Sequence, residues 1–263
     1  MAITITHIQG EADTGGTGQT FAFSTSFLPV AGRTYLVIAR FTRGTTFNSG
    51  VSAVTHGGSG LTLSRLAGTE SRSQEGSISL GQQVCAYVGT ATGSPTTGVF
   101  TLDAGSTNTT SITSRQYELL EITGNNTTTP VPQDDTFGAL NDNTSATQTF
   151  TLAGSFVNAG SFTLSAIATA NGTTDPTIPT GWTSLQSRTN STPSGRLTVA
   201  YYAGNDSTAD WSGLSTGGTE DLCGFIAEIA EAASGTDVLI QGLQAIDRGM
   251  LTQTAVRLGG LLQ

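Results

Sequence analysis

Short runs of alternating apolar and polar residues, and short continuous apolar runs, recur along the whole chain. The runs are rich in β-branched and aromatic residues and are bounded by Gly, Pro, Asn, Ser and Thr, which is the pattern of β-strands joined by turns. The predicted strands are 3–8, 19–26, 34–42, 52–56, 61–66, 83–90, 98–104 and 117–123, followed by 145–154, 161–170, 181–187, 196–204, 209–215 and 222–230. The pattern therefore predicts an all-β fold.

The second half of the chain is a diverged copy of the first. The matching segments are 19–21 with 148–150, 34–41 with 162–170, 86–87 with 200–201, and 121–122 with 228–229. The offset between partners falls from 129 (148 minus 19) to 107 (228 minus 121), as it would for one fold with loops of different length. Each copy has the size of a β-sandwich, so we expect two tandem antiparallel β-sandwiches.

The predicted organisation has four parts. Residues 1–124 form the first sandwich and residues 136–230 the second. Between them, residues 125–135 are rich in Pro, Thr and Asn, which is typical of a linker. Residues 231–263 form a C-terminal tail that is expected to be helical.

The tail carries one apolar stripe. Leu239, Leu243, Ile246 and Met250 follow one another at spacings of four, three and four residues, which places them on one side of a helix. A helix this short is marginal alone, so the stripe should be buried. Two interpretations remain open: the tail packs on its own sandwich, or it docks on a neighbouring subunit.

Charge excludes some partners. Only 11% of the residues are charged, the net charge is −9, and all ten basic residues are scattered arginines. A phosphate-binding surface needs clustered cations, so we expect no nucleic-acid partner. The first residues have no signal-peptide pattern, and no apolar run reaches the length of a membrane span. We expect synthesis in a cytosol.

The residues suited to chemistry do not form known motifs. His7 and His56 have no second His, Cys or acidic residue at metal-ligand spacing, and no phosphate loop or nucleophile elbow is present. Cys85 and Cys223 are expected to be free, buried thiols, with a disulfide or redox role as the alternative. We therefore expect no enzyme, no cofactor and no metal.

The aromatic residues of the second half have apolar partners in the first. In the alignment of the copies, Trp182 stands opposite Leu61, Trp211 opposite Phe100, Tyr201 opposite Tyr87 and Tyr202 opposite Val88. An exchange between aromatic and aliphatic residues is typical of core positions. Core packing is therefore predicted for most of them, and Trp182 and Tyr202 are kept as candidates for a glycan contact.

One family resemblance can be assigned. It is carried by Pro179–Leu185 (PTGWTSL), Arg196–Gly204 (RLTVAYYAG), Trp211 and Phe225–Ala230 (FIAEIA). These segments resemble the jelly-roll-like β-sandwich modules of structural proteins of tailed bacteriophages and of some bacterial surface proteins. The resemblance covers residues 160–230 and, more weakly, 34–124, where Gly60-Leu61-Thr62 replaces the Gly-Trp-Thr. Residues 244–263 resemble the closing segments of phage virion proteins.

The resemblance implies a non-enzymatic structural protein of a phage virion, made in the host cytoplasm. An exterior position is expected, as a head decoration or fibre or in the tail and its adsorption apparatus. Virion sites are symmetric, so a homo-oligomer is expected, with a trimer as the working number, in contact with other virion proteins. The alternative is a carbohydrate- or receptor-binding adhesin that contacts a host-surface glycan. A glycoside hydrolase is a third hypothesis.

Overall fold

The computed structural model describes residues 2–13, 20–43, 53–74, 81–103, 112–136, 146–169, 174–191, 194–214 and 222–233. This part of the chain contains strands β1 to β15 and no helix, and every strand pair is antiparallel. The prediction of an all-β, sandwich-like fold is confirmed. The predicted tail helix, with Leu239, Leu243, Ile246 and Met250, lies outside the described residues.

The strands form two large and two small sheets. Inner sheet 1 has the order β1 (Thr4–Asp13), β8 (Ile112–Thr123), β3 (Thr34–Arg43), β6 (Gly81–Thr90) and β5 (Ser64–Gln74). Outer sheet 1 has the order β2 (Thr20–Phe27), β7 (Gly98–Asp103) and β4 (Ala53–His56). Inner sheet 2 has the order β12 (Thr183–Ser191), β13 (Ser194–Tyr202), β11 (Phe162–Thr169), β15 (Leu222–Ile229) and β9 (Asp134–Thr136). Outer sheet 2 pairs β10 (Thr147–Thr151) with β14 (Thr208–Ser212).

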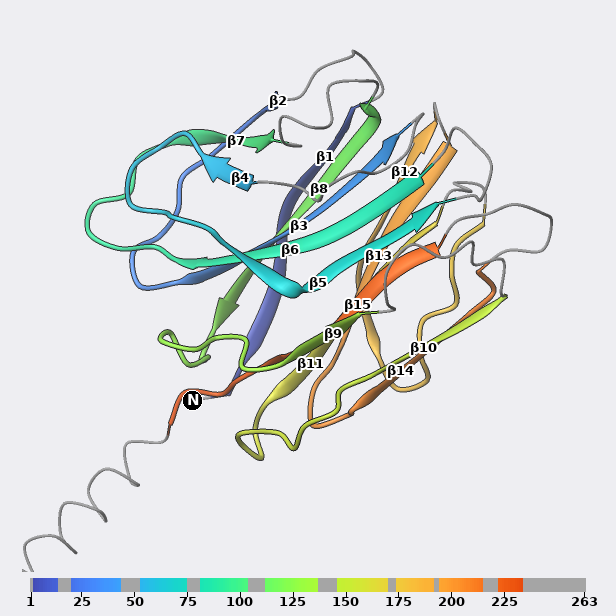
Figure 1. Ribbon diagram of the computed structural model, residues 1–263. Coiled ribbons are helices and arrows are strands. Elements are labelled where there is room, and N and C mark those ends of the chain that lie inside the picture. The colour runs from blue at the N-terminus through green and yellow to red at the C-terminus, as the bar shows by residue number, and fades with distance from the viewer. Residues whose placement is uncertain are drawn as a thin grey trace, which may run out of the picture. The chain divides into compact units, whose positions relative to one another are not determined.

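The four sheets are stacked in layers, with the two inner sheets in the middle (Figure 1). One hydrophobic cluster lies between outer sheet 1 and inner sheet 1, and another between inner sheet 2 and outer sheet 2. A third cluster lies between the inner sheets and takes residues from both halves of the chain, such as Leu36 and Leu120 from the first and Leu164 and Phe225 from the second. Residues 2–231 accordingly form one compact unit.

The strand order repeats between the halves. Read from one edge, the inner sheets run β1-β8-β3-β6-β5 and β9-β15-β11-β13-β12. Strand β1 contacts β12 and β5 contacts β9, so each inner sheet presents one edge to the opposite edge of the other. Such reciprocal contacts are those of a two-fold symmetric interface. The two copies therefore pack as the subunits of a symmetric dimer do, within one chain.

The register confirms the sequence alignment of β3 with β11 and of β8 with β15, and it corrects the alignment of β6 with β13. Strand β3 pairs Thr34 with Ile122, and β11 pairs Phe162 with Ile229, which are the predicted offsets of 128 and 107 (162 minus 34; 229 minus 122). The alignment of β6 with β13 differs. Ala86 of β6 and Val199 of β13 both face the inner cluster, which gives an offset of 113 (199 minus 86).

The predicted match of Tyr87 with Tyr201 was therefore wrong by one residue. A slip of one residue moves every side chain to the other face of the sheet. Tyr87 faces the outer cluster of its half, whereas Tyr201 packs against the inner cluster. The structural partner of Tyr87 is Ala200, and that of Cys85 is Thr198.

The segment predicted as a linker, residues 125–135, lies along the edge of inner sheet 2. The amide of Asn126 donates to the carbonyl of Ala230, and the amide of Ala230 donates to the carbonyl of Pro130. Strand β9, which overlaps the end of this segment, then pairs with β15. The segment thus closes the sheet edge. No helix of membrane-spanning length and hydrophobicity occurs in the part of the chain that the structure describes.

Candidate functional site

The space between the inner sheets is apolar over much of its area and polar in one region. Arg40 of β3 is fully buried there. Its guanidinium donates to Gln82 Oε1 at 2.8 Å and to Gln116 Oε1 at 3.0 Å, and it lies 3.4 Å from the carbonyl oxygen of Thr169 in the second half. Burial lowers the pKa of Arg40 to about 10, so the side chain remains cationic at neutral pH.

A buried carboxylate, Glu118 of β8, joins the halves in the same layer. Its side chain is fully buried and accepts a hydrogen bond from Nε of Arg188 in β12 at 2.5 Å. His7 Nε2 of β1 lies 2.7 Å from the other carboxylate oxygen. A buried carboxylate is costly without partners, and here the partners come from both halves. This arrangement connects the sheets instead of presenting a free acid.

Glu121 and Glu228 are equivalent residues of the two copies and have the same structural role. Glu228 accepts from the amide of Val157 at 2.9 Å and so holds the loop before β11. Glu121 accepts from the hydroxyl of Tyr35 at 3.1 Å, which itself accepts from the amide of Val30 in the loop before β3. Both acids therefore fix the same loop in their own copy.

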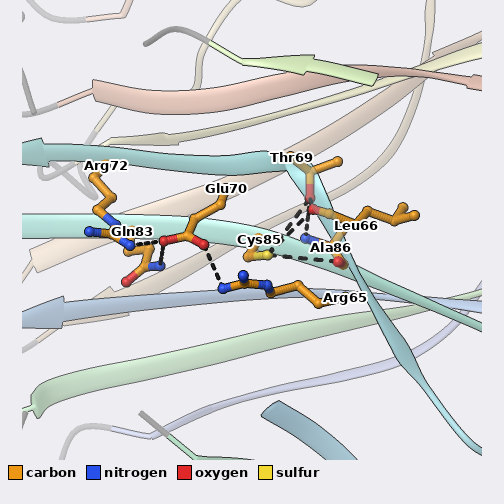
Figure 2. A network of polar contacts seen from close by, with 8 residues as sticks. All are labelled: Arg65, Leu66, Thr69, Glu70, Arg72, Gln83, Cys85 and Ala86. Carbon is orange, nitrogen blue, oxygen red and sulfur yellow. Dashed lines mark hydrogen bonds and ion pairs between the residues drawn. The ribbon is translucent and has the colours of Figure 1, made fainter. Parts of the chain in front are cut away.

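A network of polar contacts lies on β5, an edge strand of inner sheet 1 (Figure 2). Glu70 accepts from Arg65 Nη1 at 2.6 Å, from Arg72 Nη2, and from Gln83 Nε2 at 3.1 Å. Two guanidinium groups thus neutralise one carboxylate. The contact of Glu70 with Gln83 joins β5 to β6, and the two arginines hold the carboxylate on β5.

Beside this network, β5 carries a large bulge. Residues 67–70 of β5 stand opposite the single residue Cys85 of β6, between the pairs Leu66–Ala86 and Ser71–Val84. The buried hydroxyl of Thr69 donates to the carbonyl of Leu66 at 2.7 Å and accepts from the amide of Ala86 at 2.8 Å (Figure 2). Thr69 thereby replaces the missing ladder hydrogen bonds.

Cys85 lies under this bulge. Its sulfur is buried, 3.7 Å from the hydroxyl of Thr69, and burial raises the pKa of the thiol to about 12. The reactive form of cysteine is the thiolate, so this thiol is inert near neutral pH. Cys223 is also free and buried. The prediction of two free, buried thiols is confirmed.

The aromatic candidates of the second half lie at the start of β12 and the end of β13. Trp182 is only 6% exposed, and its indole N–H donates to Asp206 Oδ2 at 3.1 Å. Tyr202 is half-buried, with its ring centroid 6.2 Å from that of Trp182. Trp211 is buried and donates to the hydroxyl of Ser165 at 2.9 Å. Of the two proposed glycan contacts, Tyr202 offers the more accessible ring.

A pocket of about 280 Å³ lies in the first half and was not predicted. It is lined by residues 54–63 except Gly57, from β4 and the connection to β5. His56 lines it as well, and its Nε2 lies 3.1 Å from the carbonyl oxygen of Phe27, so this nitrogen carries the proton. The imidazole ring packs against the rings of Phe27 and Phe100.

Neither His7 nor His56 lies in a cluster of possible metal ligands in the described part of the chain. No group of three or more His, Cys, Asp or Glu residues there lies close enough to hold one ion. His7 contacts the carboxylate of Glu118, and His56 belongs to an aromatic cluster. The positions of the predicted docking residues, Leu239, Leu243, Ile246 and Met250, lie outside the described residues.

Comparison with known proteins assigns no family. No protein-family model matches the chain, and no curated protein matches it. The geometry of the described residues is therefore the basis for functional reasoning.

Proposed function

We propose that the chain is a non-enzymatic structural protein of a tailed-phage virion, placed on the exterior of the particle. The proposal combines the sequence resemblance with one structural observation. The buried polar residues between the inner sheets, above all Glu118 with Arg188, connect the two copies into one body. A single body built from both copies suits a head decoration, a fibre or a part of the tail.

The four acids discussed above support the same proposal, because each is held by hydrogen-bond donors of the fold. Glu70 and Glu118 are held by arginines, Glu121 by Arg33 and Tyr35, and Glu228 by Gln133 and the amide of Val157. General acid–base catalysis needs a group that is free to exchange a proton with a substrate. These acids instead maintain loops and sheet contacts.

The proposed partners are further copies of the chain, with a trimer as the working number, and other virion proteins. Repetition in a symmetric particle would add avidity to weak contacts. The test of the oligomer is light scattering on the purified full chain and on a variant that ends before Gly235. The full chain should be a homo-oligomer, and the shortened chain should remain folded but assemble poorly. Equal assembly of both would contradict a docking role for the tail.

The test of the virion itself is direct. Particles released by the cells that carry this gene are purified by density-gradient centrifugation and analysed by quantitative mass spectrometry. The protein should copurify with the particles in stoichiometric amounts and should bind antibody on intact particles. Its absence from purified particles, with abundant protein left in the soluble fraction, would contradict the proposal.

The second candidate function is a carbohydrate- or receptor-binding module. The observation that favours it is the pocket formed by residues 54–63, together with the half-exposed ring of Tyr202. Binding to an array of host glycans would support it. Array binding without incorporation into particles would favour this second candidate over the first.

A further inference from the structure

We propose that the pocket lined by residues 54–63 binds one ring of a neutral sugar. The inference rests on the binding-module alternative and does not require incorporation into a particle, so the two ideas can fail separately. It assigns the ligand to the first half of the chain, away from Trp182 and Tyr202.

The pocket is built on fixed elements. The amide of Gly57 donates to the carbonyl of Val99, and the carbonyls of Ser59 and Gly60 accept from the amides of Thr96 and Thr92. These bonds hold the loop 57–60 against the segment that follows β6. Gly58 allows the close approach, because a Cβ there would lie 2.1 Å from the carbonyl oxygen of Thr96. Ligand pockets are generally preformed in this way.

The lining suits a ligand with both apolar and hydroxyl surfaces. Leu61 is buried and Leu63 is half-buried, and both belong to the outer core. Thr55 and Thr62 line the same pocket and are exposed, and their side-chain hydroxyls make no hydrogen bond to any described residue. A sugar ring has C–H groups that pack on leucine and hydroxyls that pair with threonine. Hydroxyl groups donate and accept, so they can match either role.

Charge and size narrow the ligand class. His56 is the only ionisable residue in the lining, and its imidazole is engaged with the carbonyl of Phe27. The pocket therefore has no fixed charge for a phosphate, a carboxylate or an amine. Its volume of about 280 Å³ lies at the lower end of small-molecule sites. One neutral ring fits these limits better than a long or charged ligand.

The second half carries a larger side chain at the corresponding position. Gly60 and Gly181 have matching positive φ angles of 80° and 84° and precede β5 and β12. Three residues, Leu61 to Leu63, separate Gly60 from β5, whereas Trp182 alone separates Gly181 from β12. The indole of Trp182 is buried in the outer core of its half. The first half has two smaller side chains at that place and keeps a pocket beside them.

The test is a titration of the ¹⁵N-labelled full chain with neutral monosaccharides: glucose, galactose, mannose, fucose and N-acetylglucosamine. At least one sugar should shift the amide signals of residues 54–63, with a Kd in the millimolar range. The double variant Thr55→Val, Thr62→Val removes two hydroxyls from exposed positions and should weaken binding by about tenfold. Thr97→Val is the matched control, because Thr97 is exposed and does not line the pocket.

Three results would overturn the proposal. No shift with any of these sugars would exclude a neutral sugar ring. Equal affinity of the double variant and the wild type would exclude the threonine contacts. Shifts confined to the surroundings of Tyr202 would assign sugar binding to the second half instead.

Discussion

At the scale of single residues, charged groups are buried where the two inner sheets meet. Arg40 and Glu118 are both fully buried, and each contacts a residue of the second half of the chain. Removing one partner of a buried pair leaves the other charge without compensation, which costs far more than losing a surface pair. Removing a partner of a buried charge should therefore lower the free energy of unfolding more than removing a partner of an exposed one.

The first prediction compares two arginines that each pair with a glutamate. Arg188→Gln removes the arginine partner of the fully buried Glu118 and should lower the free energy of unfolding by about 3 kcal/mol. Arg33→Gln removes the partner of Glu121 at a site where the arginine is 45% exposed, and should cost less than about 1 kcal/mol. Urea unfolding measures both. Equal losses would contradict the role given to the Glu118 contact.

The second prediction concerns pH. Burial raises the pKa of Glu11, but hydrogen bonds from the amides of Ser24 and Thr25 outweigh this, and the pKa lies below its usual range. An acid with a lowered pKa in the folded state stabilises the fold above its unfolded pKa and loses this contribution as the pH falls. Glu11→Gln should therefore lower Tm at neutral pH, and the difference from wild type should shrink in acid.

Asp134 provides the control with opposite sign. Burial, with the nearby Asp135, raises the pKa of Asp134. A raised acid pKa means that stability is lost as the pH rises through the carboxyl range. Asp134→Asn should thus raise Tm at neutral pH and have little effect in acid. Two variants with the same pH dependence would show that these local contacts do not set the pKa values.

Some of these residues could be predicted from the sequence and others could not. The burial of Trp211 was anticipated because it stands opposite an apolar residue of the other copy, and Trp182, which was also kept as a candidate for a glycan contact, is buried as well. The contacts of Arg40 and Glu118 were not, because their partners across the layer lie 129 and 70 positions away in the chain. No local pattern specifies such a pair.

At the scale of the element, the bulge of β5 is the feature with the most demanding local geometry. Its three extra residues remove ladder hydrogen bonds, and Thr69 supplies the replacements. Gly68 permits the approach of β9, because a Cβ there would collide with the carboxylate of Asp134. The bulge therefore depends on particular residue types at adjacent positions.

The third prediction tests Thr69. Thr69→Val keeps the shape of the side chain but leaves the buried amide of Ala86 without an acceptor, so it should lower the free energy of unfolding by about 2 kcal/mol. Thr69→Ser keeps the hydroxyl and should lose less. Guanidinium unfolding of the two variants gives the comparison. A valine variant as stable as wild type would show that the hydroxyl does not hold the bulge.

Strand positions could be predicted well where the apolar pattern is strong. The prediction of 34–42 compares with β3 at Thr34–Arg43, and 222–230 compares with β15 at Leu222–Ile229. The polar continuation of β5 to Gln74 and the short β9 were missed, because neither contains an apolar run. The match of β6 with β13 was one residue off, because it aligned Tyr87 with a tyrosine of the second copy, whereas the structural partner of Tyr87 is Ala200.

At the scale of the whole molecule, the two copies share an interior. Each edge of one inner sheet contacts the opposite edge of the other, as in an isologous dimer. A signal for this was present in the sequence. Strand β3 has apolar residues on both faces: Tyr35 and Val37 face the outer cluster, and Leu36 and Ile38 face the inner one. A sheet with one solvated face alternates instead.

The sequence alone did not specify the face-to-face arrangement, because continuous apolar runs fit any strand that is buried on both sides. The run 125–135 was interpreted as a linker from its Pro and Thr content, yet it is hydrogen-bonded along β15. Composition describes the tendency of a segment to avoid regular structure. It does not show whether a neighbouring strand supplies partners for its backbone.

The central claim, that one interior stabilises both copies, is tested most directly by urea unfolding followed in both halves at once. Both tryptophans lie in the second half, so their fluorescence reports on that half. Hydrogen exchange measured by mass spectrometry on peptides from β3 and β6 reports on the first. A shared interior predicts that the two midpoints coincide. Separate midpoints, with one half still protected after the other has unfolded, would contradict the account.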